Sequence, residues 1–387
     1  MTNRTALRML ACATLMATVG LVRPALAADY KWPDNIPPEA TELLKPLPLS
    51  PRGQPVPGFP DGPPAVSPDV FKFTPDMIAK LKAGHFTAGI AMHTMDAGWP
   101  KLQIEGITKT LKDFGIDVVA VTDAKFLPGK QIADLEQMTA RKPDVIFSIP
   151  IDPQSQAAAY KKVAASGIKL VFLDNVPVGM APGKDYISVT ASDNEQNAYY
   201  AAKELAEAMH GQGEVGIVTL VYDYYYSVAV RTTGAKRAFA EYPGIKLVEI
   251  GTVTSPEKAY GVATAMMTAH PDMKGVFAAW DTPAEQVVAA AKTLGRKVIV
   301  TTNDIAADSA VYVARGDFTA VGSQRPYDQG VSEAKSAAYA LLGMDVPPYI
   351  SIPTLRVKKI DLLSALKDVT KQDPPASVLK VCNNACF

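Results

Sequence analysis

The residues of this sequence that are suited to chemistry stand mostly at the ends of short apolar runs. Carboxylates there can accept hydrogen bonds or transfer protons, a guanidinium can donate several hydrogen bonds, and tryptophan rings can pack on the C–H faces of a ligand. The candidates are His93, Asp96, Trp99, Asp152, Asp174, Asn175, Arg231, Trp280, Asp281, Asp304 and Gln324, and Tyr222 and Asp223 occupy the same kind of position. We therefore expect either a binding site or an acid–base site.

Apolar strand-like runs alternate with amphipathic helix-like runs along most of the chain. The predicted strands cover 87–93, 117–122, 144–150, 168–174, 214–220, 245–251, 274–280, 297–304 and 318–323. Helices are predicted at Pro75–Lys82, Pro100–Phe114, Gln131–Arg141, Gln154–Ser166, Glu195–His210, Val228–Glu241, Glu257–His270 and Pro283–Leu294. This alternation is typical of α/β proteins with parallel sheets covered on both faces, and nine strands favour two sheets over one. Ligands of such sheets bind beyond the carboxyl ends of the strands, where the candidates stand.

The termini and the charge indicate where the protein works. In its 387 residues, 39 basic side chains balance 39 acidic ones, which argues against nucleic acid or an anionic membrane as partner. Arg4 and Arg8 precede an apolar run too short to span a bilayer, and Ala25–Ala27 follow it. This pattern predicts a signal peptide over 1–27, which includes Cys12, and export to the periplasm. Residues 28–84 form a proline-rich extension that ends in the short helix, and its composition fits either a disordered tether or a strap over the domain surface.

The mature chain keeps two cysteines, Cys382 and Cys386, in a C-terminal tail at 361–387. An even pair in an exported protein predicts a disulfide that clips the tail locally. Too few further ligands stand nearby for a metal site, and we expect no cofactor.

Motifs for catalysis are weak. The G-x-G-x-x-G match at 211–216 follows a helix and leads into a strand, the reverse of the order that a dinucleotide site needs. His93 has no evident partner, which favours a role in the wall of a binding site. Asp281 and Asp304 leave open a glycosidase-like carboxylate pair, although carboxylates also suit the hydroxyls of a bound sugar.

Three segments resemble the ribose-binding-protein branch of the periplasmic type I sugar-binding proteins: "TASDNEQNAYYAAKELA", "MMTAHPDMKGVFAAWD" and "VGSQRPYDQG". The likeness runs from about Thr87 to Lys358. It implies two Rossmann-like lobes joined by a three-segment hinge, at 85–192 with 323–352 and at 193–322 with 353–360, with crossings near Ser192, Gln324 and 352–355. It also implies a non-enzymatic, monomeric protein that captures a sugar or polyol and delivers it to an ABC permease in the inner membrane.

The resemblance also assigns residues. It places the family's binding positions at His93, Trp99, Asp174, Asn175, Arg231, Trp280, Asp304 and Gln324. Asn175 stands where the family has an arginine, and Trp280 and Ile149 stand where it has asparagines, while Pro100 replaces an aromatic residue. These replacements point away from ribose, toward a smaller or less hydroxylated polyol or toward an amino-bearing ligand held over Trp99 and Trp280 by cation–π attraction.

Two alternatives remain beside transport. The same closed form would serve a sensor that presents its ligand to a membrane receptor, and Asp281 with Asp304 would serve a secreted glycoside-processing enzyme. The export signal and the lack of a DNA-binding helical pair ahead of the core argue against a transcriptional repressor with this core.

Overall fold

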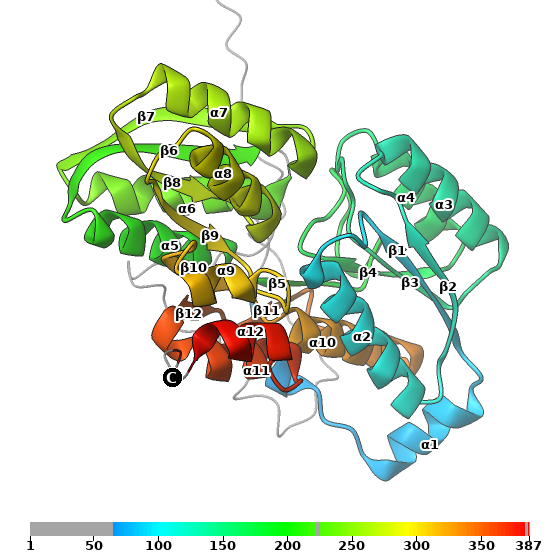
Figure 1. The fold of residues 1–387 in the computed structure, drawn as a ribbon. Coiled ribbons are helices and arrows are strands. Elements are labelled where there is room, and N and C mark those ends of the chain that lie inside the picture. Colours follow the sequence, from blue (N-terminus) through cyan, green and yellow to red (C-terminus); the bar gives the residue numbers. More distant parts are fainter. Residues whose placement is uncertain (1–64, 222–224, 384–385, 387) are drawn as a thin grey trace, which may run out of the picture.

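The computed structural model describes residues 65–221, 225–383 and 386, which form two lobes that each surround one sheet (Figure 1). The first sheet has the order β11-β5-β4-β3-β1-β2, and all its neighbouring strands run parallel. Its strands are β1 (Thr87–Met92), β2 (Asp117–Asp123), β3 (Val145–Ser148), β4 (Lys169–Leu173), β5 (Ser188–Ser192) and β11 (Tyr349–Ile352). The strand centres are buried by helices that cover both faces of the sheet, except in the edge strand β2, where Val119 and Val121 are exposed.

The helices of this lobe are α1 (Pro75–Ala83), α2 (Gly98–Asp113), α3 (Pro128–Ala140), α4 (Ala157–Ala165) and α10 (Pro326–Leu341). Two glycines allow α2 and α10 to pack with their backbones in contact. A Cβ at Gly106 would lie 2.2 Å from the carbonyl oxygen of Tyr327, and one at Gly330 would lie 2.3 Å from that of Gln103. Any larger residue at either glycine would force the helices apart.

The second sheet has the order β12-β10-β9-β8-β6-β7. Its strands are β6 (Gln212–Leu220), β7 (Gly244–Val253), β8 (Met273–Ala278), β9 (Ile299–Asn303), β10 (Ala320–Ser323) and β12 (Leu355–Lys358). The pair β10 and β12 is antiparallel, and the other neighbours are parallel. The predicted fold class, two lobes with parallel sheets, is therefore confirmed, with one antiparallel edge.

The helices of the second lobe are α5 (Asn194–Ala208), α6 (Tyr226–Ala240), α7 (Ala259–Ala269), α8 (Asp281–Thr293) and α9 (Ala310–Arg315). Short 3-10 helices stand at η3 (Pro68–Val70), η4 (Pro256–Lys258) and η5 (Lys359–Asp361). Here α5 and α6 repeat the close packing of α2 and α10, because a Cβ at Gly234 would lie 2.1 Å from the carbonyl oxygen of Glu195.

The chain crosses between the two sheets three times: after β5, after β10 and after β11. Side chains at the crossings are buried and polar, among them Ser192, Ser323 and Gln324. We propose the lobe bounds expected from the sequence, 85–192 with 323–352 and 193–322 with 353–360, and these crossings support them.

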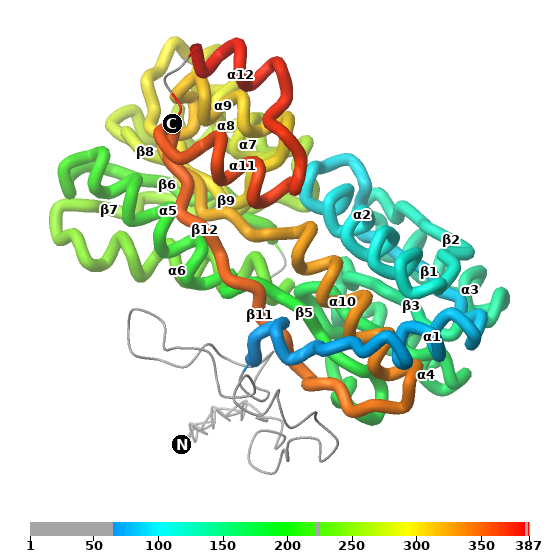
Figure 2. Tube along the Cα trace, turned by 90° about the horizontal axis from the view of Figure 1, so that it is seen from below, coloured from blue at the N-terminus to red at the C-terminus, as the bar shows by residue number. Residues whose placement is uncertain are grey.

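The arm predicted at 28–84 is described only from residue 65, and the predicted signal peptide lies outside the described residues. The described part packs on the first lobe (Figure 2). Val66 pairs with Ile350 of β11, and the rings of Phe71 and Phe73 meet the ring of Tyr339 edge-on, each at 5.0 Å between centroids.

The C-terminal tail is helical, with α11 (Leu362–Thr370) and α12 (Ala376–Cys382), and the disulfide Cys382–Cys386 is present. The tail contacts both lobes (Figure 2). Its α12 packs on α9 of the second lobe, while Lys371 Nζ lies 2.7 Å from Asp328 of α10 and Gln372 Nε2 donates to Glu105 of α2 at 3.2 Å. The tail therefore bridges the hinge on the molecular surface.

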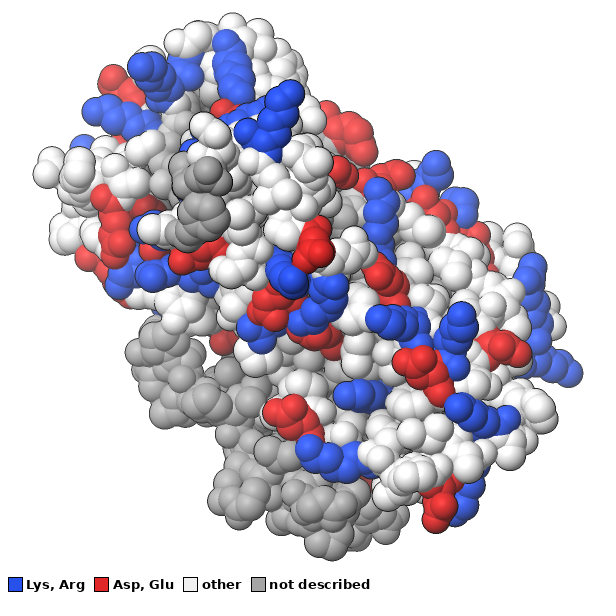
Figure 3. All heavy atoms as spheres, turned by 60° about the horizontal axis from the view of Figure 1, so that its bottom comes forward, with Lys and Arg blue, Asp and Glu red and all other residues white. Residues whose placement is uncertain are grey.

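The face of the molecule toward this tail carries interspersed positive and negative side chains without a large patch of one sign (Figure 3). This agrees with the balanced composition. Among the helices that the structure describes, none combines the length and the apolarity needed to cross a bilayer.

Candidate ligand-binding site

A buried ion pair forms the second-lobe wall of a cavity between the lobes. Arg231 of α6 lies with its Nη1 3.0 Å from Asp304 Oδ2, and the two side chains are 4% and 9% exposed. The guanidinium also donates from Nη1 to the carbonyl oxygen of Ala279 at 2.8 Å and from Nε to Asn194 Oδ1 at 2.8 Å. These three contacts fix its plane, so Arg231 is held rigidly against the sheet edge.

Trp280 and Asp281 belong to the same wall at the start of α8. Trp280 is the N-cap residue in extended conformation, and Asp281 opens the helix, where its Oδ1 accepts from the backbone N–H of Thr282 at 2.8 Å. Burial, reinforced by the nearby charge of Asp304, raises the pKa of Asp281 to about 7. The amino end of a helix favours a negative charge at this position.

The first-lobe wall is aromatic. His93, at the end of β1, meets the rings of Trp99 and Phe126 edge-on, at 5.9 and 4.9 Å between centroids. Burial lowers the pKa of His93 to about 3, so its imidazole is uncharged at neutral pH. A base of so low a pKa takes up a proton poorly at neutral pH, so His93 suits the wall of a binding site better than general-base catalysis.

Asp174 supplies a carboxyl group from the first lobe. Its backbone is left-handed, with φ 52°, and its Oδ1 accepts from Gln329 Nε2 of α10 at 3.1 Å. Burial raises its pKa to about 7, against the attraction of Arg231. Asp304 occupies the equivalent position in the second lobe, because it follows β9 and its backbone is also left-handed, with φ 72°. The backbone N–H of Asp174 donates to β5, and that of Asp304 donates to β10. Aspartate tolerates this conformation better than most residues.

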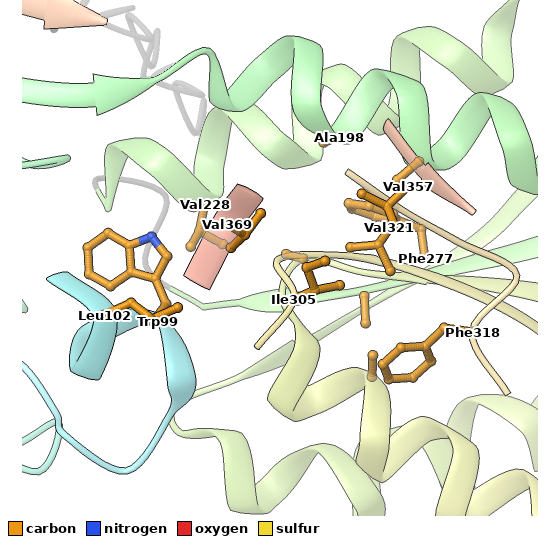
Figure 4. Packing of buried hydrophobic residues seen from close by; sticks show 14 of the residues in the cluster. Trp99, Leu102, Ala198, Val228, Phe277, Ile305, Phe318, Val321, Val357 and Val369 are labelled. Atoms are coloured by element: carbon orange, nitrogen blue, oxygen red, sulfur yellow. The ribbon is translucent and has the colours of Figure 1, made fainter. Parts of the chain in front are cut away.

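The lobes touch around these residues and enclose a cavity of about 70 Å³. Eight of the eleven predicted binding residues line it: His93, Trp99, Asp174, Arg231, Trp280, Asp281, Asp304 and Gln324. Pro100 and Ile149, the positions where the sequence departs from the family pattern, line it too. Figure 4 shows the indole ring of Trp99 on the helix of the first lobe, and Trp99 and Val228 of the second lobe both line the cavity.

Three predicted residues lie elsewhere. Asp96 is exposed and lines a separate surface pocket, to which Lys258 of the second lobe also contributes. The Asp152 carboxylate accepts from two backbone N–H groups that follow it and thus caps a turn. Asn175 is fully buried, and its Oδ1 accepts from the backbone N–H of Ser227 at 3.2 Å, so it joins the two lobes without lining the cavity. Tyr222 and Asp223 lie outside the described residues.

Other lining residues were not predicted: Thr94, Ala97, Phe126, Leu220, Tyr225, Ser227 and Val228. Thr94 and Ala97 follow β1, Phe126 follows β2, and Leu220 ends β6, so extending each predicted strand by a few residues would have found them. Tyr225, Ser227 and Val228 stand at the start of α6 instead. Two successive left-handed residues, Lys125 and Phe126, bring the ring of Phe126 to His93. In the described part of the chain, no group of three His, Cys, Asp or Glu residues is placed to hold a metal ion.

Two lobes that enclose a small cavity with side chains from both sides define a hinged ligand-binding protein. A family model for the periplasmic binding protein domain matches residues 88–345. The chain therefore belongs to the periplasmic binding protein family, and its resemblance to the ribose-binding type I branch is confirmed.

Individual relatives agree with this assignment. The chain is 31% identical over 169 residues to a D-ribose/D-allose-binding protein of Pseudomonas aeruginosa, a match that covers 43% of this chain and 52% of that protein. It is 26% identical over 243 residues to the ribose import binding protein of Escherichia coli, covering 62% of this chain and 80% of the relative. A periplasmic solute binding protein of an ABC transporter from Actinobacillus succinogenes, solved with bound D-allose, superposes with a TM-score of 0.65 at 26% identity, covering 74% of this chain and 100% of that one.

Proposed function

We propose that the protein is a periplasmic solute-binding protein that captures a sugar or polyol between its lobes and presents it to an ABC importer. One observation carries the proposal: the cavity is lined from both lobes by indole rings, carboxyl groups and a guanidinium. Rings of this kind pack on the C–H faces of a sugar, while the charged groups bind its hydroxyls.

The relatives' names support the ligand class, since they refer to ribose, allose and apiose. The cavity volume argues against a large ligand, because about 70 Å³ is far below the roughly 300 Å³ at which pockets for drug-sized molecules begin. Closure would link capture to delivery, since only the ligand-bound arrangement brings the faces of both lobes together for a permease.

A binding titration tests this proposal directly. The chain has three tryptophans, and Trp99 and Trp280 line the cavity, so intrinsic fluorescence should report ligand binding. Sugars and linear polyols would be screened first by thermal shift, because a ligand that binds only the folded state raises the melting temperature. We expect at least one to raise it and to change the fluorescence with saturation; a screen without any such compound would contradict the proposal.

We also propose that the ligand leaves chemically unchanged. Asp304 is bound to Arg231, which suits a fixed hydrogen-bond acceptor and not a carboxylate that must act as nucleophile or base. Mass spectrometry of the ligand after hours with the protein should show its original mass. Detection of a hydrolysis product, lost in Asp304→Asn, would favour the glycoside-processing alternative.

A further inference from the structure

The charges that face the cavity do not balance. Three carboxyl groups line it, those of Asp174, Asp281 and Asp304, against the single guanidinium of Arg231. His93 adds no positive charge, because burial lowers its pKa to about 3. Among the described residues, no lysine lines the cavity. An enclosed site with this composition has an excess of negative charge whenever its carboxyl groups are ionised.

Arg231 does not compensate for all three groups. Its Nη1 bonds Asp304 at 3.0 Å and the backbone of Ala279, and its Nε bonds Asn194. Its attraction for Asp174 acts only at longer range. Asp304 therefore has a direct cationic partner, whereas the structure shows no ion pair at the other two carboxyl groups within the described residues.

The contacts of Asp174 and Asp281 come from neutral donors. Asp174 accepts from the amide of Gln329, and Asp281 accepts from the backbone N–H of Thr282. Both side chains are more than nine-tenths buried. Buried carboxylates with neutral donors alone are costly, so each must gain a proton or a cation when the cleft closes.

Two further acids increase the negative potential. Glu333 is fully buried on α10, one turn beyond Gln329, and its pKa is raised by burial and by Asp174. Glu285 follows Asp281 by one turn of α8, and its charge contributes to the raised pKa of Asp281. The surroundings of both carboxyl groups are thus acidic on the side away from the cavity as well.

The aromatic rings on both walls of the cavity suit a cation. Trp99 and Trp280 line the cavity from different lobes, and the face of an indole attracts a cation by roughly 0.5–2 kcal/mol, most strongly where water is excluded. Phe126 adds a third ring. Aromatic faces attract a cation, and carboxyl groups without a cationic partner bind it directly. Together they favour a ligand with an ammonium group over a neutral one.

We infer that the ligand is an amino sugar or amino polyol whose ammonium group is bound by the carboxylates of Asp174 and Asp281 and the indole rings. This inference rests on the proposed function and narrows its ligand class. The ammonium would supply the positive charge that the cavity lacks, and the hydroxyls would bind Asp304, Arg231 and Gln324. The rival is a cavity whose carboxyl groups stay protonated and donate hydrogen bonds to a neutral ligand.

Matched pairs of compounds distinguish the two. The full mature protein would be screened by thermal shift at pH 7.5 with D-glucose and D-glucosamine, D-galactose and D-galactosamine, D-mannose and D-mannosamine, and glycerol and 2-amino-1,3-propanediol. Each pair exchanges one hydroxyl for one amine. We expect the amine of at least one pair to bind at least tenfold more tightly than its neutral partner.

Calorimetry in buffers of different ionisation enthalpy adds a second measurement. Because burial raises the pKa of Asp174 and of Asp281 to about 7, an ammonium that binds their ionised forms should release protons at pH 6.5. A neutral ligand that accepts hydrogen bonds from protonated carboxyl groups should release none.

Variants locate the effect. Asp281→Asn should weaken amine binding at least tenfold more than it weakens binding of the neutral partner compound, and Asp174→Asn should do the same. Asp76→Asn is the matched control, because Asp76 is exposed on α1 and does not line the cavity.

Two results would overturn the inference in different ways. If neutral compounds bind as tightly as their amines, the inference is wrong and the proposed function stands. If no sugar, polyol or amine binds at all, the proposed function is contradicted and the inference falls with it.

Discussion

Gly98 of the first lobe and Ala306 of the second lie so close that a Cβ at position 98 would be 2.0 Å from the Cβ of Ala306. Real side-chain atoms do not approach this closely, so the lobes meet here only because residue 98 is glycine. This contact and the hydrogen bond from Ser227 to Asn175 are interlobe contacts close to the cavity.

Gly98→Ala should therefore hold the cleft partly open. We expect ligand affinity to fall at least tenfold, because the closed form must relieve the clash, while the melting temperature without ligand changes little. Isothermal titration and a thermal melt measure the two effects. Gly129→Ala is the matched control, since a Cβ at Gly129 has no atom within 4 Å. Equal affinities in the two variants would mean that the contact does not limit closure.

Breaking the ion pair between Arg231 and Asp304 should destabilise the protein. Arg231→Met leaves a buried carboxylate without its cation, which typically costs about 3–5 kcal/mol of unfolding free energy. The double variant Arg231→Met with Asp304→Leu should be less destabilised than the single one, because no buried charge remains. Urea unfolding measures both. A single variant as stable as the parent would show that Asp304 finds another partner.

Stability without ligand should fall between pH 6.5 and 8.0. The folded-state pKa of Asp174 and of Asp281, about 7, lies above the ordinary value of 3.8, so the folded state binds more protons than the unfolded state and loses stability as pH rises through 7. The loss should be on the order of 1 kcal/mol per carboxyl group over this window. Thermal melts of the parent and of Asp281→Asn check it, and the variant should show the smaller slope.

Below pH 6.5 a second group opposes this trend. His93 has a folded-state pKa of about 3, below its ordinary value of 6.5, so its contribution to stability is present above pH 6.5 and is lost as pH falls toward 3. His93→Gln should therefore make the protein more stable at pH 5 relative to pH 8 than the parent is. A pH profile identical to that of the parent would contradict the burial of an uncharged imidazole.

The disulfide should stabilise the tail without affecting the ligand. It closes a loop of only a few residues, for which loss of loop entropy predicts about 2 kcal/mol. Cys382→Ser with Cys386→Ser should thus lower the melting temperature by several degrees. Ligand affinity should stay within threefold, since neither sulfur lines the cavity. Reducing the disulfide of the parent protein should lower the melting temperature by the same amount. An unchanged melting temperature would show that the disulfide does not stabilise the tail.

Long apolar strands could be predicted from the sequence, whereas three short or polar strands were missed. β5, β11 and β12 read "SVTAS", "YISI" and "LRVK", and each is too short or too polar for its periodicity to indicate a strand. β5 and β11 pair with each other, and β12 pairs with β10, so long-range pairing determines them. The predicted helices end with the one that became α8, so α9, α10, α11 and α12 were not among them. The last two are held by packing on α9 and α10, a long-range contact that the sequence does not reveal.

The candidate site was more predictable than its details. The rule that ligands bind beyond the carboxyl ends of parallel strands brought eight candidates to the cavity. The rule did not bring Asp152 and Asn175 to the cavity. The Asp152 carboxylate caps its own turn, and the Asn175 amide accepts a hydrogen bond from the facing lobe. In the sequence, such residues cannot be told apart from residues that face a ligand. Nor does the sequence reveal the left-handed backbone that brings Phe126 to His93.

The C-terminal tail is attached to α9 on one lobe and to Asp328 and Glu105 on the other. Rotation about the hinge must therefore shift the tail relative to one of its two attachments. Glu105 and Gln372 lie on the surface, far along the chain from each other. A donor dye near one and an acceptor dye near the other would convert opening and closing into an optical signal, without placing any label in the ligand cavity.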